Sequence, residues 1–208
     1  MTKKRVFHKK GIGRVDVFPL KIPDFNEMCR ICLVNRDRAP NVKKRRMWWR
    51  NYLLLVIGAN TGVRIEGVLQ LMPRDLAGGQ LCIKETKTNK LVKFEINKLL
   101  YDAIIEYVEE YDLTEREYLF STESSKKPIT RQRAYDIIKR LAKMAGVKSR
   151  VGCHSLRKSY ARWEYDKSGD LVKVSRMLGH ASPLVTLQYI CLEEKAITEA
   201  RKKSTYGL

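Results

Sequence analysis

Residues 153–189, CHSLRKSYARWEYDKSGDLVKVSRMLGHASPLVTLQY, decide the fold and the chemistry that we expect of this chain. They place His154 three residues before Arg157, His180 directly after a Leu-Gly pair, and Tyr189 nine residues after His180. Cleavage of a phosphodiester needs cations at the non-bridging oxygens, a proton donor for the leaving oxygen and a nucleophile. The segment holds most of those groups, so it predicts a site for phosphodiester chemistry that needs no metal.

The composition indicates a polyanionic partner. The chain has 208 residues, with 42 Lys and Arg against 23 Asp and Glu and a formal net charge of +19. A globular chain this basic usually binds nucleic acid. A membrane surface is the alternative, but no apolar run approaches the roughly 18 residues that span a bilayer. The N-terminus lacks the apolar segment of a signal peptide and the five cysteines are scattered, so we expect a cytoplasmic protein with reduced thiols.

The chain is expected to form one domain preceded by a short arm. Residues 1–20 are basic and contain one acid, Asp16, which predicts an arm before a globular domain at 21–208. The arm is either a solvated tail or a segment that follows a DNA strand through phosphate contacts. Residues from about 192 to 208 are expected to form a helical tail of the domain.

Apolar spacing, caps and turn residues predict a mostly α fold with one small antiparallel β hairpin, an α+β arrangement. Strands at 81–83 and 91–96 flank a polar loop at 87–90, after a turn at Gly78-Gly79. Residues 118–120 are expected to form a short buried strand or turn. Helices are expected from Pro23-Asp24, from Asn41 to about 60, and at 63–71, 97–111, 130–145, 155–168, 170–178, 183–190 and 192–203.

Arg64 and Arg157 are the first candidates for binding a phosphate. Each lies at the predicted start of a helix, and helix N-termini favour anions. A guanidinium also presents a planar fork that matches two phosphate oxygens. His154 shares a helical face with Arg157 because the two are three residues apart. Taken singly, each arginine is more often structural, but their joint placement favours a site.

Four further side chains could complete such a site. His180 follows Gly179, where a turn can direct the imidazole into a site, although a core histidine is the alternative. Tyr189 could be a packing residue or a nucleophile, and a nucleophilic phenol with a reference pKa near 10 needs a base or cations nearby. Lys87 and Lys90 lie in the hairpin loop, which is either a solvated turn or the carrier of a proton donor for a leaving oxygen.

A bound metal is not expected. Cys29 and Cys32 form one Cys-x-x-Cys pair within a predicted helix, and no second ligand pair follows at the spacing of a zinc site. We therefore predict neither a metal nor another cofactor.

Together these residues resemble the tyrosine recombinase family, which includes the phage-type integrases. The resemblance covers about residues 20–200, and the ordered boxes are far more specific jointly than singly. The matching boxes are Thr61-Gly62-Val63-Arg64, the hairpin segment Thr86-Lys87-Thr88, His154-Ser155-Leu156-Arg157, Leu178-Gly179-His180 and Tyr189.

The resemblance implies a site-specific DNA recombinase that cleaves and rejoins strands through a 3′-phosphotyrosyl intermediate without ATP. It assigns Tyr189 as the nucleophile, with His154 as its base or hydrogen-bond partner. It further implies that Arg64 and Arg157 hold the non-bridging oxygens, that His180 donates to a phosphate oxygen, and that Lys87 is the general acid. The expected partners are double-stranded DNA and other protomers, four of them around two duplexes, joined through the C-terminal segment.

Two features depart from the family pattern. An acidic residue often stands three positions after the first arginine, but here that position is Gly67 and the acid is Glu66. A helical core-binding domain usually precedes the catalytic domain, whereas here only the basic arm does, so the chain is expected to be a short member or a fragment. The arm, Lys90 and the run Lys43, Lys44, Arg45 and Arg46 are expected to contact DNA phosphates instead.

Two other functions fit the same residues. A type IB topoisomerase-like enzyme would share the chemistry but relax supercoils, and a non-catalytic recombination factor would bind DNA with the same fold. The sequence leaves open the recognition site, the type of rearrangement, and whether Tyr189 cuts the DNA of its own protomer or of a neighbour.

Overall fold

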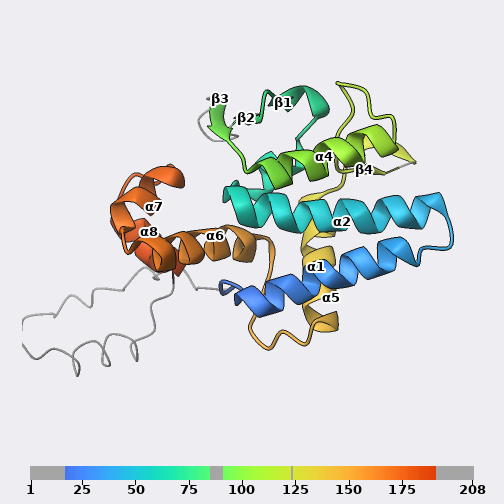
Figure 1. The fold of residues 1–208 in the computed structure, drawn as a ribbon. Helices are drawn as coiled ribbons and strands as arrows, with labels where there is room; N and C mark the ends of the chain where they lie inside the picture. The colour runs from blue at the N-terminus through green and yellow to red at the C-terminus, as the bar shows by residue number, and fades with distance from the viewer. Residues whose placement is uncertain (1–16, 85–90, 123, 191–208) are drawn as a thin grey trace, which may run out of the picture.

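The computed structural model describes residues 17–84, 91–122 and 124–190, and it shows a mostly helical chain with two small antiparallel sheets (Figure 1). This confirms the predicted fold class. In chain order the elements are α1 (Ile22–Asp37), α2 (Val42–Thr61), α3 (Ile65–Leu69), the 3-10 turn η1 (Pro73–Asp75), β1 (Leu76–Ala77), β2 (Gln80–Lys84), β3 (Leu91–Glu95), α4 (Lys98–Glu110), β4 (Ser121–Thr122), β5 (Ser125–Pro128), α5 (Arg131–Met144), α6 (Cys153–Ser168), α7 (Leu171–Met177) and α8 (Pro183–Ile190).

The central element is α2, which lies between α1 and α4 (Figure 1). Its stretch from Leu53 to Ile57 is apolar at every position and buried, as expected of a helix enclosed on all sides. The Asn41 side chain caps its start by accepting from the Lys44 amide at 2.9 Å. Gly62 ends the helix in the left-handed conformation, with φ of 64°. The helix α5 packs against α1, α2, α3 and α6.

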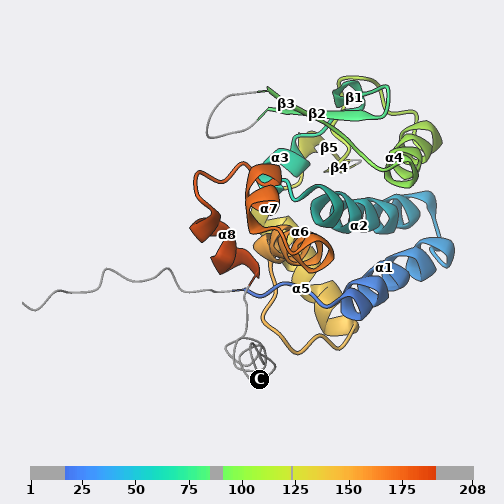
Figure 2. The same ribbon diagram turned by 60° about the vertical axis from the view of Figure 1, so that its left-hand side comes forward.

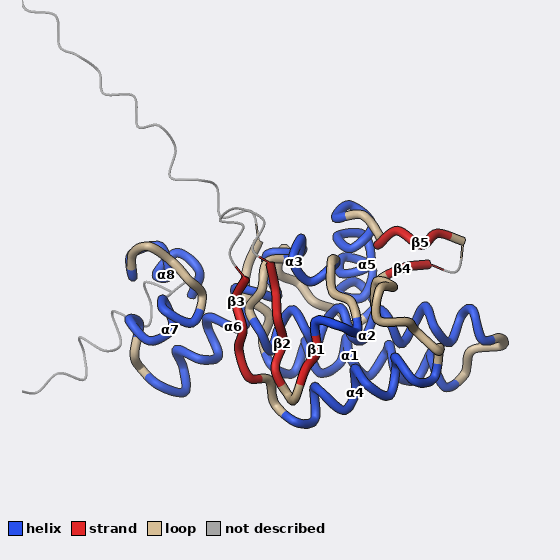
Figure 3. The backbone as a smooth tube through the Cα atoms, turned by 90° about the horizontal axis from the view of Figure 1, so that it is seen from above, coloured by secondary structure: helices blue, strands red, loops and turns tan. Residues whose placement is uncertain are grey.

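The strands form a three-stranded sheet in the order β1-β2-β3 and a separate pair, β4-β5 (Figure 3). The predicted hairpin corresponds to β2 and β3, in which Leu81 opposes Phe94. The turn at Gly78 and Gly79 has φ values of 57° and 79°, as a tight hairpin turn requires. It adds the short strand β1, which was not predicted. The pair β4-β5 was also not predicted, because its polar sequence shows no apolar alternation.

Two apolar clusters hold the molecule together. The larger one joins α1 to α5, the three-stranded sheet and the first turn of α6. The smaller one consists of Ala161, Val174, Leu178 and Ile190, with Tyr160 and Tyr189 packed against it. It fastens α7 and α8 to the distal part of α6, and these three helices lie together in Figure 2. Tyr189 therefore packs against the smaller cluster and not against the main core.

Some of the predicted element limits differ from those in the structure. The helix expected at 63–71 is shorter, because Arg64 is its extended N-cap and the chain turns before Pro73. Residues 17–20, the end of the expected arm, contact α6, and the Leu20 amide donates to Ser159 Oγ at 2.8 Å. Residues 1–16, the loop at 85–90 and the helix expected at 192–203 lie outside the described residues. Within the described part of the chain, no helix is long and apolar enough to cross a membrane.

Candidate active site

The site begins where α6 crosses the C-terminal end of α2. A Cβ atom on Gly58 would lie 2.7 Å from Leu156 Cδ1, so a larger residue there would require Leu156 to move away from this close crossing. At Gly62, a Cβ atom would lie 2.3 Å from Tyr160 Cδ1, and the φ of 64° also favours glycine. The crossing therefore brings the first turns of α6, which carry His154 and Arg157, to the end of α2.

Arg157 lies at the centre of the site and is only 5% exposed. Its Nη1 donates to the Gly62 carbonyl oxygen, and its Nη2 donates to the Leu178 carbonyl oxygen at 2.6 Å. Carbonyl oxygens hold a guanidinium in place without cancelling its charge. The arrangement thus links the end of α2 and the end of α7 around one fixed cation, and such a cation suits a phosphate oxygen.

His180 contacts both Arg157 and the following helix. Arg157 Nη2 lies 3.3 Å from His180 Nε2, and Thr186 Oγ1 lies 2.9 Å from His180 Nδ1. Because arginine can only donate, Nε2 is the acceptor and the proton belongs on Nδ1, directed at Thr186. Burial, Arg157 and Arg64 together lower the pKa of His180 from 6.5 to about 4. The imidazole is therefore neutral at pH 7.

The Tyr189 hydroxyl lies 3.2 Å from His154 Nε2. The His180 ring lies against Tyr189 edge-on, with 4.6 Å between the ring centroids. Burial, with the nearby Arg157 and Lys158 cations, lowers the pKa of His154, which keeps that imidazole neutral and able to accept a proton. Arg157 Cζ and Lys158 Nζ each lie 5.9 Å from the centre of the Tyr189 ring, so two cations lie close to the ring that carries this hydroxyl.

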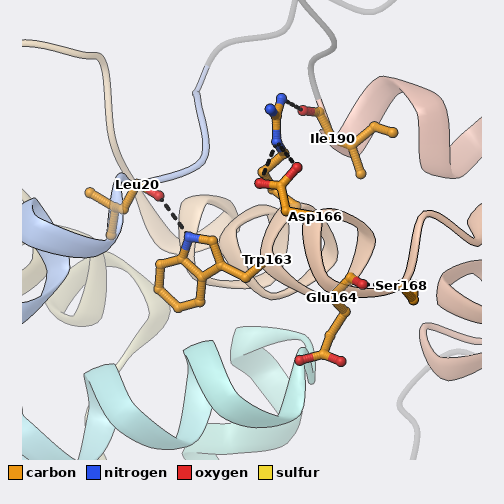
Figure 4. Close-up of polar contacts among 7 residues, drawn as sticks. Leu20, Trp163, Glu164, Asp166, Ser168 and Ile190 are labelled. Carbon is orange, nitrogen blue, oxygen red and sulfur yellow. Dashed lines mark hydrogen bonds and ion pairs between the residues drawn. The ribbon is translucent and has the colours of Figure 1, made fainter.

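The helix that carries Tyr189 is held at its C-terminal end by α6 (Figure 4). Arg162 Nη1 donates to the Ile190 carbonyl oxygen at 3.1 Å, and Arg162 Nε contacts both carboxylate oxygens of Asp166 at 2.9 Å. On the same helix, Trp163 Nε1 donates to the Leu20 carbonyl oxygen at 3.2 Å. One helix thus positions both Tyr189 and the segment that enters the domain.

Arg64 lies half-buried at the N-terminus of α3, close enough to His180 to lower the pKa of that imidazole. The neighbouring acid, Glu66, pairs with Arg131 Nε of α5 at 3.2 Å. The acid that stands one position earlier than the family pattern therefore connects α3 to α5. Gly67 is closely packed, because a Cβ there would lie 3.0 Å from Val63 Cγ1.

The structure brings together five of the six predicted catalytic residues, namely Arg64, His154, Arg157, His180 and Tyr189. Lys87 and the predicted DNA-binding residue Lys90 lie outside the described residues. The sequence reasoning missed two site residues, Lys158 and Thr186. Lys158 is 7% exposed, and its Nζ donates to the Val17 carbonyl oxygen at 2.9 Å. Its place directly after Arg157 was the available signal, whereas Thr186 had none.

The basic run at the start of α2 lies far from this cluster. Arg46 and Thr61 are fifteen residues apart on one helix, which corresponds to about 22 Å. Arg45 pairs with Glu110 at 3.0 Å, and the Arg46 guanidinium lies over the Tyr111 ring at 5.3 Å. Lys43 and Lys44 are exposed. The phosphate contacts expected of the run therefore belong to another part of the surface than the catalytic cluster.

An open cavity of about 630 Å³ adjoins the catalytic cluster, and His154 and Lys158 of α6 line one side of it. Arg131, Gln132 and Tyr135, from the first turns of α5, line the other side. The cavity is thus bordered by cationic and hydrogen-bonding groups, among them His154, whose Nε2 contacts the Tyr189 hydroxyl. Among the described residues, no group of three His, Cys, Asp or Glu side chains could hold a metal ion.

Known sequences match most of the chain. The profile of the phage integrase family matches residues 35–195. The probable integrase/recombinase YoeC of Bacillus subtilis is 35% identical over 154 residues, which cover 74% of this chain and 83% of YoeC. The tyrosine recombinase XerH of Helicobacter pylori is 31% identical over 73% of this chain but only 43% of its own length. The chain therefore spans most of one relative and less than half of the other.

Solved structures show the same fold. The XerH recombinase in a post-cleavage complex with its difH substrate has a TM-score of 0.72 at 24% identity, covering 93% of this chain and 55% of that one. The catalytic domain of bacteriophage HP1 integrase has a TM-score of 0.59 at 19% identity, covering 90% of this chain and 95% of that domain. A dimer of lambda integrase bound to a core site also matches, with a TM-score of 0.63 at 16% identity and coverage of 94% of this chain and 51% of that one.

Proposed function

Because the chain belongs to the phage integrase family of tyrosine recombinases, we propose that it cleaves and rejoins double-stranded DNA through Tyr189 as a site-specific recombinase. The observation that carries the proposal is the Tyr189 hydroxyl, which lies 3.2 Å from His154 Nε2 on a ring whose centre is 5.9 Å from both Arg157 Cζ and Lys158 Nζ. A phenol is a weak nucleophile until a neighbouring base or cation favours loss of its proton. His154 is the neighbouring base at this hydroxyl.

In the proposed reaction, Tyr189 Oη attacks a DNA phosphate while its proton passes to His154 Nε2. A bond forms between phosphorus and the phenolic oxygen, and the bond to the 5′ oxygen breaks, so the 3′ end remains on the enzyme. Arg64 and Arg157 stabilise the charge on the non-bridging oxygens. Lys87 gives a proton to the leaving 5′ oxygen. Attack by another 5′-hydroxyl reverses these steps, and no ATP is consumed because the phosphotyrosyl bond keeps the energy of the cleaved bond.

The proposed role of His180 requires a change from the arrangement in the structure. Its Nε2 accepts from Arg157 here, so it donates nothing to a phosphate in this state. When a phosphate binds, Arg157 Nη2 can direct its hydrogen to the phosphate oxygen, and the His180 proton can reside on Nε2. The Thr186 hydroxyl would then donate to Nδ1 instead of accepting.

Strand exchange between two duplexes would require an assembly of four protomers, which we keep as part of the proposal. The C-terminal residues that would join protomers lie outside the described residues. The division into an arm at 1–20 and a catalytic domain at 21–208 also remains a proposal. Because the substrate is DNA, we keep the cytoplasm as the proposed compartment.

A covalent-trapping assay tests this function directly. Wild type and Tyr189→Phe are incubated with nicked duplexes from the native genomic flanks and separated on a denaturing gel. We expect a protein–DNA adduct with wild type only, and equal DNA binding by both, since the variant loses one hydroxyl. An adduct formed by Tyr189→Phe would refute the nucleophile. Relaxation of a plasmid that lacks specific sites would indicate a topoisomerase, and DNA binding without any adduct would indicate a non-catalytic factor.

A further inference from the structure

A second, smaller cavity lies between α2 and α5. It has a volume of about 110 Å³, and three arginines border it, Arg50 from α2 and Arg133 and Arg140 from α5. Arg50 is buried, with 6% of its surface exposed, whereas Arg133 and Arg140 are exposed. We refer to this cavity with its three arginines as the α2–α5 cleft.

Arg50 has more hydrogen-bonding capacity than its surroundings use. A guanidinium has five N–H donors. Nη1 donates to the Ser121 carbonyl oxygen at 3.1 Å, while Nε is buried without a partner among the described residues. Burial lowers the pKa of Arg50, and the nearby Arg133 and Arg46 lower it further. A buried cation that faces other cations is unfavourable unless an anion joins it.

The cleft also has an excess of positive charge. Asp136 is the acidic residue that borders it, and one of its carboxylate oxygens already accepts from Gln132 Nε2 at 3.0 Å. The Arg140 guanidinium lies 5.8 Å from the centre of the Trp48 ring, which holds it at the rim. Asn51, 6% exposed, borders the same cavity, and its side-chain oxygen has no partner among the described residues.

We propose that the α2–α5 cleft binds one backbone phosphate of the DNA, separate from the phosphate that Tyr189 attacks. This inference rests on the proposed function, since it takes DNA as the substrate. The Arg50 guanidinium would approach the phosphate from the floor of the cleft, and Arg133 and Arg140 would approach it from the rim. A tetrahedral anion with several acceptor oxygens can accept from all three guanidinium groups.

The position of the cleft determines which phosphate it would hold. Arg50 precedes Thr61 by eleven residues on α2, which separates it by about 16 Å from the end of the helix that contacts Arg157. Phosphates of one strand advance only about 3.4 Å along the duplex axis per nucleotide. The cleft would therefore hold a phosphate several nucleotides away or across a groove. The helix α5 borders both cavities, so one rigid element would set the register between them.

The test compares Arg133→Gln and Arg140→Gln with Arg30→Gln. All three arginines are exposed and each change removes one positive charge, but Arg30 pairs with Glu27 on α1, away from the cleft. Affinity for a nicked duplex is measured by fluorescence anisotropy over a range of salt concentrations. We expect each cleft variant to weaken binding on the order of tenfold. The double variant should reduce the slope of log K against log salt by less than the roughly 0.9 of one whole phosphate, because Arg50 remains in the cleft. Arg30→Gln should leave the slope near that of wild type.

Further variants and measurements distinguish a wrong cleft assignment from a wrong proposed function. Arg50→Lys keeps the charge but loses the planar guanidinium and its hydrogen bond to the Ser121 carbonyl oxygen. At a temperature where its melting curve shows it folded, it should weaken binding while keeping the salt slope. At saturating DNA, the Arg133 and Arg140 variants should still form the Tyr189 adduct. Slopes and affinities equal to those of Arg30→Gln would overturn the site, whereas a wild type that neither binds nor traps DNA would refute the proposed function itself. If millimolar inorganic phosphate raised the melting temperature of wild type but not of the double variant, with DNA binding unchanged, the cleft would bind a free anion and the DNA assignment would be wrong.

Discussion

Replacing Gly62 with alanine should destabilise the protein more than the same change at Gly169, although both glycines end a helix with φ of 64°. An alanine in the left-handed conformation costs about 1–2 kcal/mol of stability, and this term is common to both sites. A Cβ at Gly62 would also lie 2.3 Å from Tyr160 Cδ1 and 3.0 Å from Leu178 Cδ2. Overpacking of this kind costs about 1–3 kcal/mol more.

At Gly169, a Cβ atom would meet no described atom within 4 Å, so only the backbone term applies. We therefore expect a loss of about 2–5 kcal/mol for Gly62→Ala and about 1–2 kcal/mol for Gly169→Ala. Urea unfolding followed by circular dichroism measures both free energies, provided that the slopes against denaturant agree. The pair of variants isolates the contact between the end of α2 and the side chain of Tyr160.

The same substitution should also affect the chemistry. The Gly62 carbonyl oxygen accepts from Arg157, so a displaced Tyr160 that shifts this peptide would shift the central cation. We expect the yield of covalent adduct to fall for Gly62→Ala and to stay near wild type for Gly169→Ala, at a temperature where both are folded. Equal destabilisation of the two variants, or full adduct formation by Gly62→Ala, would contradict the reasoning.

Two more predictions concern His180. Thr186→Val removes the hydroxyl beside His180 Nδ1. Single-turnover cleavage should then slow by about two- to tenfold, the equivalent of one hydrogen bond of about 0.5–1.5 kcal/mol, and Thr186→Ser should restore the rate. An unchanged rate in Thr186→Val would exclude a positioning role for Thr186. Burial lowers the pKa of His180 from 6.5 to about 4. Between these two pH values the unfolded chain binds more protons than the folded chain, so the free energy of unfolding should fall as the pH drops from about 6.5 to about 4. His180→Gln should flatten this part of the melting temperature against pH, and parallel curves for the two proteins would contradict the assignment.

Much of the fold was predictable because its signals are local. The Asn41 cap, the Gly62 and Gly179 turns and the hairpin of β2 and β3 each depend on a few adjacent residues. The strand pair β4-β5 escaped prediction because its residues are mostly polar and show no apolar alternation, although Ser121 is buried. The spacing of His154 and Arg157 likewise fixes a shared helical face before any packing occurs.

The sequence by itself determined the kinds of side chain that the site contains, their order along the chain and the family to which they belong. Only the tertiary structure decided which atoms meet. The His154–Tyr189 contact joins residues 35 positions apart, and the Arg157–Gly62 contact joins residues 95 positions apart. Thr186 and the buried Arg50 became visible as functional candidates only there. The physical reason is that turns and caps follow from local backbone preferences, whereas burial, pKa and hydrogen-bond partners depend on helices that approach each other only when the core packs.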